Sequence, residues 1–208
     1  MILIGSRALS LRLPFLKRKP ADFDFICTEV ECQSWIESNK DKLNISKVYP
    51  LKEFNKIIVE SNTPGCNCEF EIIMPGSSNE LLTELVTNDP QTIPSEFGSI
   101  PSLNTLFTIK ASHKYKNTRP DFFWKTVNDY HLMKKCGASI TGDLQDFYNL
   151  RKQESYKGQQ FPKLNVDKKD FFTNGGQLQY VYEHDDIHKA IAIMDRPAYT
   201  YYGKDGEE

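Results

Sequence analysis

Three short stretches decide how this sequence is read: GSRAL at residues 5–9, DFDF at 22–25 and EFEII at 69–73. The last two alternate acidic with aromatic residues, and such runs are typical of strands. Alternation along a strand places Asp22 and Asp24 on one face. The same reasoning places Glu69 and Glu71 on one face of a second strand. The sequence therefore predicts a sheet with carboxylates gathered on it, preceded by a Gly-Ser pair.

The rest of the chain is organised around these stretches. Strands are predicted at 2–4, 23–28, 56–60 and 68–74, with helices at 29–43 and from 77 onward. The turn NTPGCN at 62–67 marks a hairpin. Beyond residue 101 the pattern becomes helical, at 103–116, 121–136, 144–154 and 180–194. The prediction is an α+β protein, with a small mixed β-sheet lobe over 1–100 and a mainly helical lobe over 101–208.

Composition narrows the function classes. The 208 residues are 39% hydrophobic and 26% charged, as in an ordinary globular protein. The formal net charge of -2 disfavours extensive duplex binding, although a local basic patch is conceivable at Arg12, Lys17, Arg18 and Lys19. No apolar run approaches the roughly 20 residues that span a bilayer, so no membrane partner is expected. Five cysteines without a secretion signal favour a reducing compartment, and we expect a cytoplasmic protein.

The Gly-Ser pair and the paired aspartates suit phosphoryl chemistry. Two hard oxygen ligands from Asp22 and Asp24 suit Mg²⁺ (or Mn²⁺), which keeps sites for water and substrate phosphates. Gly5 lets the backbone approach a phosphate, and Ser6 offers a hydroxyl and an N–H. Arg7 could meet a phosphate bidentately or pair with a carboxylate.

A third carboxylate would complete a two-metal site. Glu69 and Glu71 are both candidates, and Glu71 is preferred because it lies nearer the middle of its predicted strand. A nucleoside triphosphate is the expected substrate, because metal ions neutralise its charge while hydrogen-bond donors position its phosphates.

In this order, GSRAL, DFDF and EFEII resemble the nucleotidyltransferase superfamily related to DNA polymerase beta. That family has Gly-Ser opening a helix, Asp-x-Asp on the next strand and a later acid on another strand. The resemblance covers about seventy residues. It implies that Gly5 and Ser6 hold the triphosphate, and that Asp22 and Asp24 bind two metals with Glu71 or Glu69. The basic, proline-containing segment before Asp22 implies that the helix after Ser6 is short.

A second constellation lies in the helical lobe, which holds all four histidines: His113, His131, His184 and His188. In EHDDIH (183–188), His184 and His188 share a face of the predicted helix, where a transition metal could bind. The order His113, His184-Asp185, Asp195 resembles the HD phosphohydrolase pattern, which implies metal-dependent hydrolysis of nucleoside monophosphates.

The stretches SHKYK, FPKLNVDKKDFF and YVYEHDDIHKAIAIMDRPAYTYY are similar to poorly characterised proteins of phages and large DNA viruses. Some of these are labelled nucleotidyltransferases and others are linked to deoxynucleoside monophosphatase activity. Three functions therefore stay open. The first is nucleotidyl transfer to RNA, a protein or a small molecule. The second is the phosphohydrolase, and the third is a non-catalytic module that binds nucleotide.

Overall fold

The computed structural model describes residues 1–14, 16, 20–114 and 120–156, and for 120–124 and 156 it describes the backbone alone. The chain divides into two compact units, Met1–Leu106 and Phe107–Glu208. The first unit contains a mixed sheet with helices, and the described part of the second is helical. This confirms the α+β prediction.

The described part of the chain contains seven strands, six α-helices and two 3-10 turns. The strands are β1 (Ile2–Ile4), β2 (Asp22–Cys27), β3 (Ile45–Leu51), β4 (Lys56–Ser61), β5 (Asn67–Ile72), β6 (Ile93–Ser95) and β7 (Gly98–Ile100). The α-helices are α1 (Gly5–Arg12), α2 (Glu29–Asn39), α3 (Ser78–Asn88), α4 (Leu103–Ser112), α5 (Pro120–Lys135) and α6 (Gln145–Tyr156), and the 3-10 turns are η1 (Lys52–Phe54) and η2 (Gly142–Leu144).

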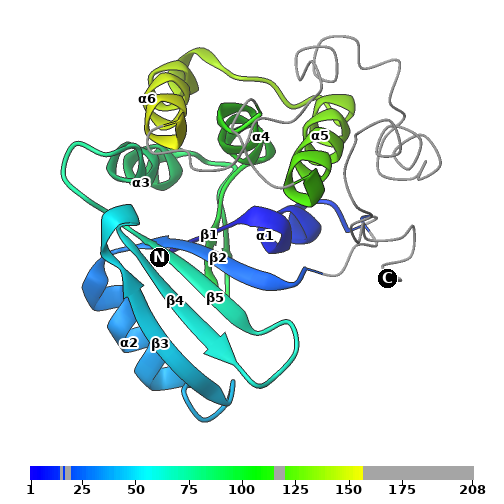
Figure 1. Cartoon of the computed structure of the whole chain (residues 1–208). Helices are drawn as coiled ribbons and strands as arrows, with labels where there is room; N and C mark the ends of the chain where they lie inside the picture. Colours follow the sequence, from blue (N-terminus) through cyan, green and yellow to red (C-terminus); the bar gives the residue numbers. More distant parts are fainter. Residues whose placement is uncertain (15, 17–19, 115–119, 157–208) are drawn as a thin grey trace. The chain divides into compact units, whose positions relative to one another are not determined.

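The seven strands form one sheet in the order β3-β4-β5-β2-β1-β7-β6. β2 pairs antiparallel with β1 and parallel with β5, so it lies near the middle of the sheet (Figure 1). β4 pairs antiparallel with β5, as the predicted hairpin around 62–67 requires. The strand with the two aspartates is therefore flanked on both sides, and its register with each neighbour is fixed.

Aromatic side chains fill one face of the sheet under α2. The rings of Phe25 and Phe70 stack at 5.1 Å between centroids, and Trp35 of α2 lies 5.4 Å from Phe25 and 5.3 Å from Phe70. Phe25 and Phe70 are lateral neighbours on β2 and β5 and are fully buried. Because residues 23 and 25 take this apolar face, alternation places Asp22 and Asp24 on the opposite face.

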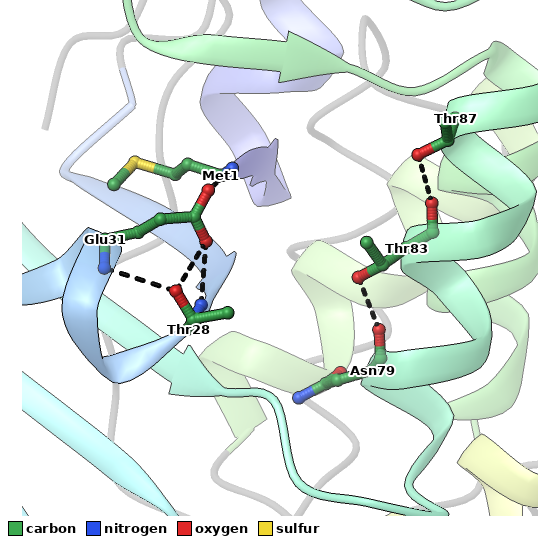
Figure 2. Close-up of polar contacts among 6 residues, drawn as sticks. All are labelled: Met1, Thr28, Glu31, Asn79, Thr83 and Thr87. Atoms are coloured by element: carbon green, nitrogen blue, oxygen red, sulfur yellow. Dashed lines mark hydrogen bonds and ion pairs between the residues drawn. The ribbon is translucent and has the colours of Figure 1, made fainter.

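The start of α2 is fixed by a capping box (Figure 2). The Thr28 hydroxyl accepts from the Glu31 N–H at 3.2 Å, and the Thr28 N–H donates to Glu31 Oε2 at 2.8 Å. The Met1 amino group donates to the other carboxylate oxygen of Glu31. One carboxylate thus joins the beginning of β1 to the beginning of α2.

Helix α3 begins where a helix was predicted, and its N-cap Ser77 accepts from the Glu80 N–H. Its threonine hydroxyls bond back along the helix, Thr83 to the Asn79 carbonyl at 2.9 Å and Thr87 to the Thr83 carbonyl at 2.7 Å (Figure 2). These hydroxyls are therefore satisfied within the helix.

Arg12, one residue of the basic patch considered from the sequence, serves the fold. Its Nε donates to the Pro101 carbonyl at 2.7 Å, and Nη2 donates to the carbonyls of Ile100 (2.8 Å) and Gln91. The guanidinium thus joins the end of α1 to the end of β7 and to the segment before β6. Residues 17–19 of the same expected patch lie outside the described residues.

Two differences from the sequence predictions concern element boundaries. The helix predicted at 29–43 ends at Asn39, because the chain turns through 40–44 and Asn44 has a left-handed φ of 49°. The helix predicted at 103–116 ends at Ser112. Strands β3, β6 and β7 were not predicted.

In the second unit, a buried ion pair joins two helices. Lys110 Nζ of α4 lies 3.1 Å from Asp129 Oδ2 of α5, and the Asp129 side chain is 1% exposed. His131 is also buried, with its ring edge-on to Tyr130 at 5.3 Å. None of the helices in the described part of the chain has the length and apolar character that crossing a bilayer requires.

Candidate active site

The candidate site is built on the acidic face of β2. Asp24 pairs laterally with Glu69 of β5, whereas Glu71 pairs with Ile26. Adjacent strands lie about 4.8 Å apart, so Glu69 is the direct neighbour of Asp24 on this face. Among the two candidates for the third acid, the register favours Glu69, although Glu71 was preferred from the sequence. Asp22, Asp24, Glu69 and Glu71 all lie on the same face.

Gly5 brings the backbone against the second aspartate. Its φ is +68°, and a β-carbon built at this position would overlap Oδ2 of Asp24 and lie 2.7 Å from Cγ. Only glycine combines this left-handed conformation with so close an approach. The first residue of α1 is therefore held directly beside the Asp24 carboxylate.

The N-terminus of α1 is well suited to an anion. Helix α1 follows β1 without a loop, its N-cap Ile4 makes no side-chain capping bond, and its first turn contains no acidic residue. The first N–H groups of a helix lack intrahelical acceptors and carry partial positive charge. Such an end binds phosphate readily.

Within the described part of the chain, two polar atoms of the site are buried and have no hydrogen-bond partner: Ser6 Oγ and Asp22 Oδ1. Ser6 is 2% exposed. An unsatisfied buried polar group typically costs about 1–3 kcal/mol, so natural proteins usually supply a partner. A carboxylate oxygen is a ligand that Mg²⁺ prefers, and a serine hydroxyl can donate to a phosphate oxygen. The residues present therefore fit a divalent cation with a phosphate group.

The two glutamates of β5 already have a cation. Lys56 Nζ of β4 forms an ion pair with Glu69 and lies 3.3 Å from Glu71 Oε1. The Asn79 amide of α3 donates to Glu71 Oε2 at 3.4 Å. Within the residues that the structure describes, no three His, Cys, Asp or Glu side chains are grouped to hold a metal ion.

Lys56 and Asn79 are functional candidates that the sequence analysis missed. The signal for Lys56 was present in the hairpin, because a tight turn at 62–67 pairs residue 56 with residue 71. No comparable local signal existed for Asn79, since its contact with Glu71 depends on where α3 packs.

Arg7 belongs to α1, and its side chain reaches the start of β2, where it serves the fold. Its Nη2 donates to the Gly65 carbonyl at 2.7 Å and its Nε to the Asp22 carbonyl at 3.3 Å. The guanidinium lies over the Phe23 ring, 3.7 Å from the centroid. Burial lowers the pKa of Arg7, although nearby Cys66 and Asp22 oppose this shift. The geometry thus gives Arg7 a structural task, and its predicted contact with nucleotide stays a prediction.

The predicted hydrolase site falls mostly outside the described residues. His113 follows α4 and is half-buried. The other members of the set, His184, Asp185, His188 and Asp195, lie outside the described residues, so this site and its transition metal stay predictions.

Comparison with known proteins gives families for both parts of the chain. Residues 1–86 match the family described as Domain of unknown function (DUF7277), and residues 105–208 match the family described as Domain of unknown function (DUF7275). No curated protein and no solved structure matches the chain. Because the match to DUF7275 covers half of the chain, this protein belongs to the DUF7275 family.

Proposed function

We propose that the first unit is a metal-dependent nucleotidyltransferase that transfers a nucleotidyl group from a nucleoside triphosphate to an acceptor. The observation that carries the proposal is the contact of Gly5 with Asp24. It joins the N-terminus of a helix, which favours phosphate, to a carboxylate, which favours a divalent cation. A bound metal–triphosphate complex needs both features side by side.

The residues take the following roles in this proposal. Asp22 and Asp24 hold Mg²⁺ or Mn²⁺, and the Asp22 oxygen without a partner gains a ligand there. A cation held by these residues would neutralise negative charge on the substrate phosphates. The N–H groups of the first turn of α1 and the buried Ser6 hydroxyl bind phosphate oxygens. Gly5 sets the distance between these two parts.

For the acceptor, the proposal rests only on the chemistry of the donor site and on the net charge of the chain. RNA, a protein and a small molecule are all compatible with the donor site. The net charge of -2 argues against a long duplex as acceptor.

The test follows transfer from an α-labelled nucleoside triphosphate to RNA, protein or the enzyme itself, in Mg²⁺ or Mn²⁺. Asp24→Asn is expected to lower transfer more than roughly 100-fold, since even indirect partners of a metal ligand commonly contribute 10–100-fold. Asp41→Asn is the matched control, because Asp41 is exposed in the turn after α2. Equal loss in both variants, or full activity in Asp24→Asn, would refute the mechanism.

A nucleotide-binding module without turnover is the second candidate. The specific observation in its favour is that Lys56 already pairs with both glutamates of β5, so the expected third acid is not open to a metal. This candidate predicts that nucleotide binds in a manner sensitive to Asp24→Asn, while no metal supports transfer or hydrolysis.

A second assay on the same preparations distinguishes the phosphohydrolase from the nucleotidyltransferase and from the nucleotide-binding module. Phosphate release from nucleoside monophosphates is followed for the wild type, Asp24→Asn and His184→Ala. Release that is lost only in His184→Ala would place the hydrolysis in the second unit, and the transfer assay would then decide separately whether the first unit has the proposed activity.

A further inference from the structure

Lys56 is the residue that distinguishes this acidic face from a simple cluster of carboxylates. It begins β4, opposite Glu71, and its side chain is 28% exposed. Its ammonium contacts carboxylate oxygens of both Glu69 and Glu71, while Glu71 also accepts from Asn79. The Glu71 side chain is 15% exposed, so its pairing takes place largely away from water.

The positions of the carboxylates explain why a cation is needed there. Glu69 and Glu71 are two residues apart on one face of β5, and Asp24 lies beside Glu69 on β2. Like charges that neighbour one another on a sheet face are destabilising. Their repulsion grows as water is excluded, because the effective dielectric constant falls. Lys56 supplies the compensating charge from within the chain.

The same contacts limit what else these glutamates can bind. A second divalent cation beside Asp24 would need oxygens of Glu69 or Glu71 as ligands. The ammonium of Lys56 already takes one oxygen of each. A metal ion at that place would meet a positive charge within a few ångströms, and the repulsion would oppose its binding.

We propose that Lys56 is a positioning residue that serves as the built-in second cation of the site. Asp22 and Asp24 then bind a single divalent cation, and Glu69 and Glu71 hold Lys56 in place of a second one. This inference rests on the proposed function, because it assumes that Asp22 and Asp24 take a divalent cation. It departs from the expectation of a two-metal site built from three carboxylates.

The number of Mn²⁺ ions bound by the full chain tests the inference. Titration with MnCl₂ alone, with free Mn²⁺ followed by electron paramagnetic resonance, is expected to show one ion per wild-type chain. Lys56→Met is expected to bind two, because Glu69 and Glu71 lose their cation and become ligands. Lys56→Arg, which keeps the charge, and Lys52→Met, which removes an exposed lysine of η1, are expected to bind one.

Variants of the glutamates test the inference in an otherwise intact protein, in case Lys56→Met fails to fold. Glu69→Gln and Glu71→Gln are each expected to keep the single Mn²⁺, with a somewhat weaker affinity, because each removes a negative charge that compensates Lys56. Adding Glu69→Gln to Lys56→Met is expected to return the count from two to one. Loss of the single Mn²⁺ in Glu69→Gln would show that the glutamate is a metal ligand and would overturn the inference.

The outcomes separate this inference from the proposed function. A wild type that binds two ions, or a folded Lys56→Met that still binds one, overturns the role of Lys56 and leaves the Asp22–Asp24 site standing. A wild type that binds none, or whose binding survives the double change Asp22→Asn and Asp24→Asn, refutes the proposed metal site itself and the role of Lys56 with it.

Discussion

Gly5 and Asp24 lie in direct contact, with the α-carbon of Gly5 placed where any β-carbon would overlap the Asp24 carboxylate. The contact joins the end of β1 to the adjacent strand, since Ile4 is the lateral partner of Asp24. Gly5 is held there in a left-handed conformation, with φ of +68°. This one relationship fixes both the direction in which α1 leaves the sheet and the surroundings of the carboxylate.

Replacing Gly5 by alanine should therefore damage stability and function together. A left-handed non-glycine residue costs roughly 1–2 kcal/mol, and the added methyl group must also displace Asp24. Gly76→Ala is the control, because Gly76 has φ of +71° and no heavy atom within 4 Å of a built β-carbon. We expect Gly5→Ala to lose about 1–3 kcal/mol more than Gly76→Ala, the usual range for overpacking. Urea denaturation measures both, and equal losses would show that the Asp24 contact is unimportant for stability.

Replacing Arg7 should lower the stability of the fold without changing the affinity for nucleotide. Its two hydrogen bonds to backbone carbonyls and its stacking on Phe23 are lost in Arg7→Met. Hydrogen bonds from charged donors contribute about 1.5–3 kcal/mol, so the free energy of unfolding should fall by that amount. The dissociation constant for Mg²⁺–ATP should stay unchanged. A weakened nucleotide complex with unchanged stability would instead establish Arg7 as a phosphate ligand.

The capping box at Glu31 should make stability depend on pH. Burial acts to raise the pKa of Glu31, but hydrogen bonds from the Met1 amino group and Thr28 outweigh it and lower that pKa. A lowered pKa in the folded state means that the stabilisation is complete above the ordinary glutamate pKa of about 4.3. It is lost as pH falls through the folded-state pKa.

The measurement is the difference in unfolding free energy between the wild type and Glu31→Gln from pH 7 to pH 3. We expect this difference to be constant at neutral pH and to shrink as the solution becomes acidic. Glu37→Gln, at an exposed position of the same helix, is the control and should show no such trend. A difference that grows on acidification would contradict the assigned direction.

The buried ion pair of the second unit should contribute strongly to its stability. Asp129→Asn leaves Lys110 without its charge partner, and breaking such a pair from one side costs about 3–5 kcal/mol. Asp143→Asn, an exposed aspartate in η2, should be nearly neutral. Thermal unfolding of the full chain compares them. A midpoint for Asp129→Asn equal to that of Asp143→Asn would show that the pair is energetically unimportant.

The elements with strong local signals could be predicted from the sequence. β2 and the β4–β5 hairpin follow from the alternation around Asp22 and from the turn at 62–67, and α3 follows from its cap at Ser77. Each of these signals lies within a few residues of the element that it specifies. The Gly-Ser pair was also informative, because a helix that starts directly after a strand needs a residue such as Gly5.

The missed strands depend on distant partners. β3 is an edge strand whose residues are half-buried or exposed, and it contains Pro50, which edge strands tolerate, so its sequence alternates weakly. β6 and β7 have three residues each, and they become strands because β7 pairs with β1. The pairing of Lys56 with the glutamates required the strand register as well as the residues.

The pairing of Ile2 with Ser99 has a consequence for how the protein is made. β1 precedes its parallel neighbour β7 in the chain, with β2 to β6 between them, so β7 emerges from the ribosome later than all of these strands. Contacts between segments so distant in the chain form slowly, since a long loop must close first. Domains generally fold as units during synthesis, so one edge of the apolar strand Ile2–Ile4 should lack its partner until translation has passed residue 100. The pairing of β1 with β7 would then be the last to form in this sheet.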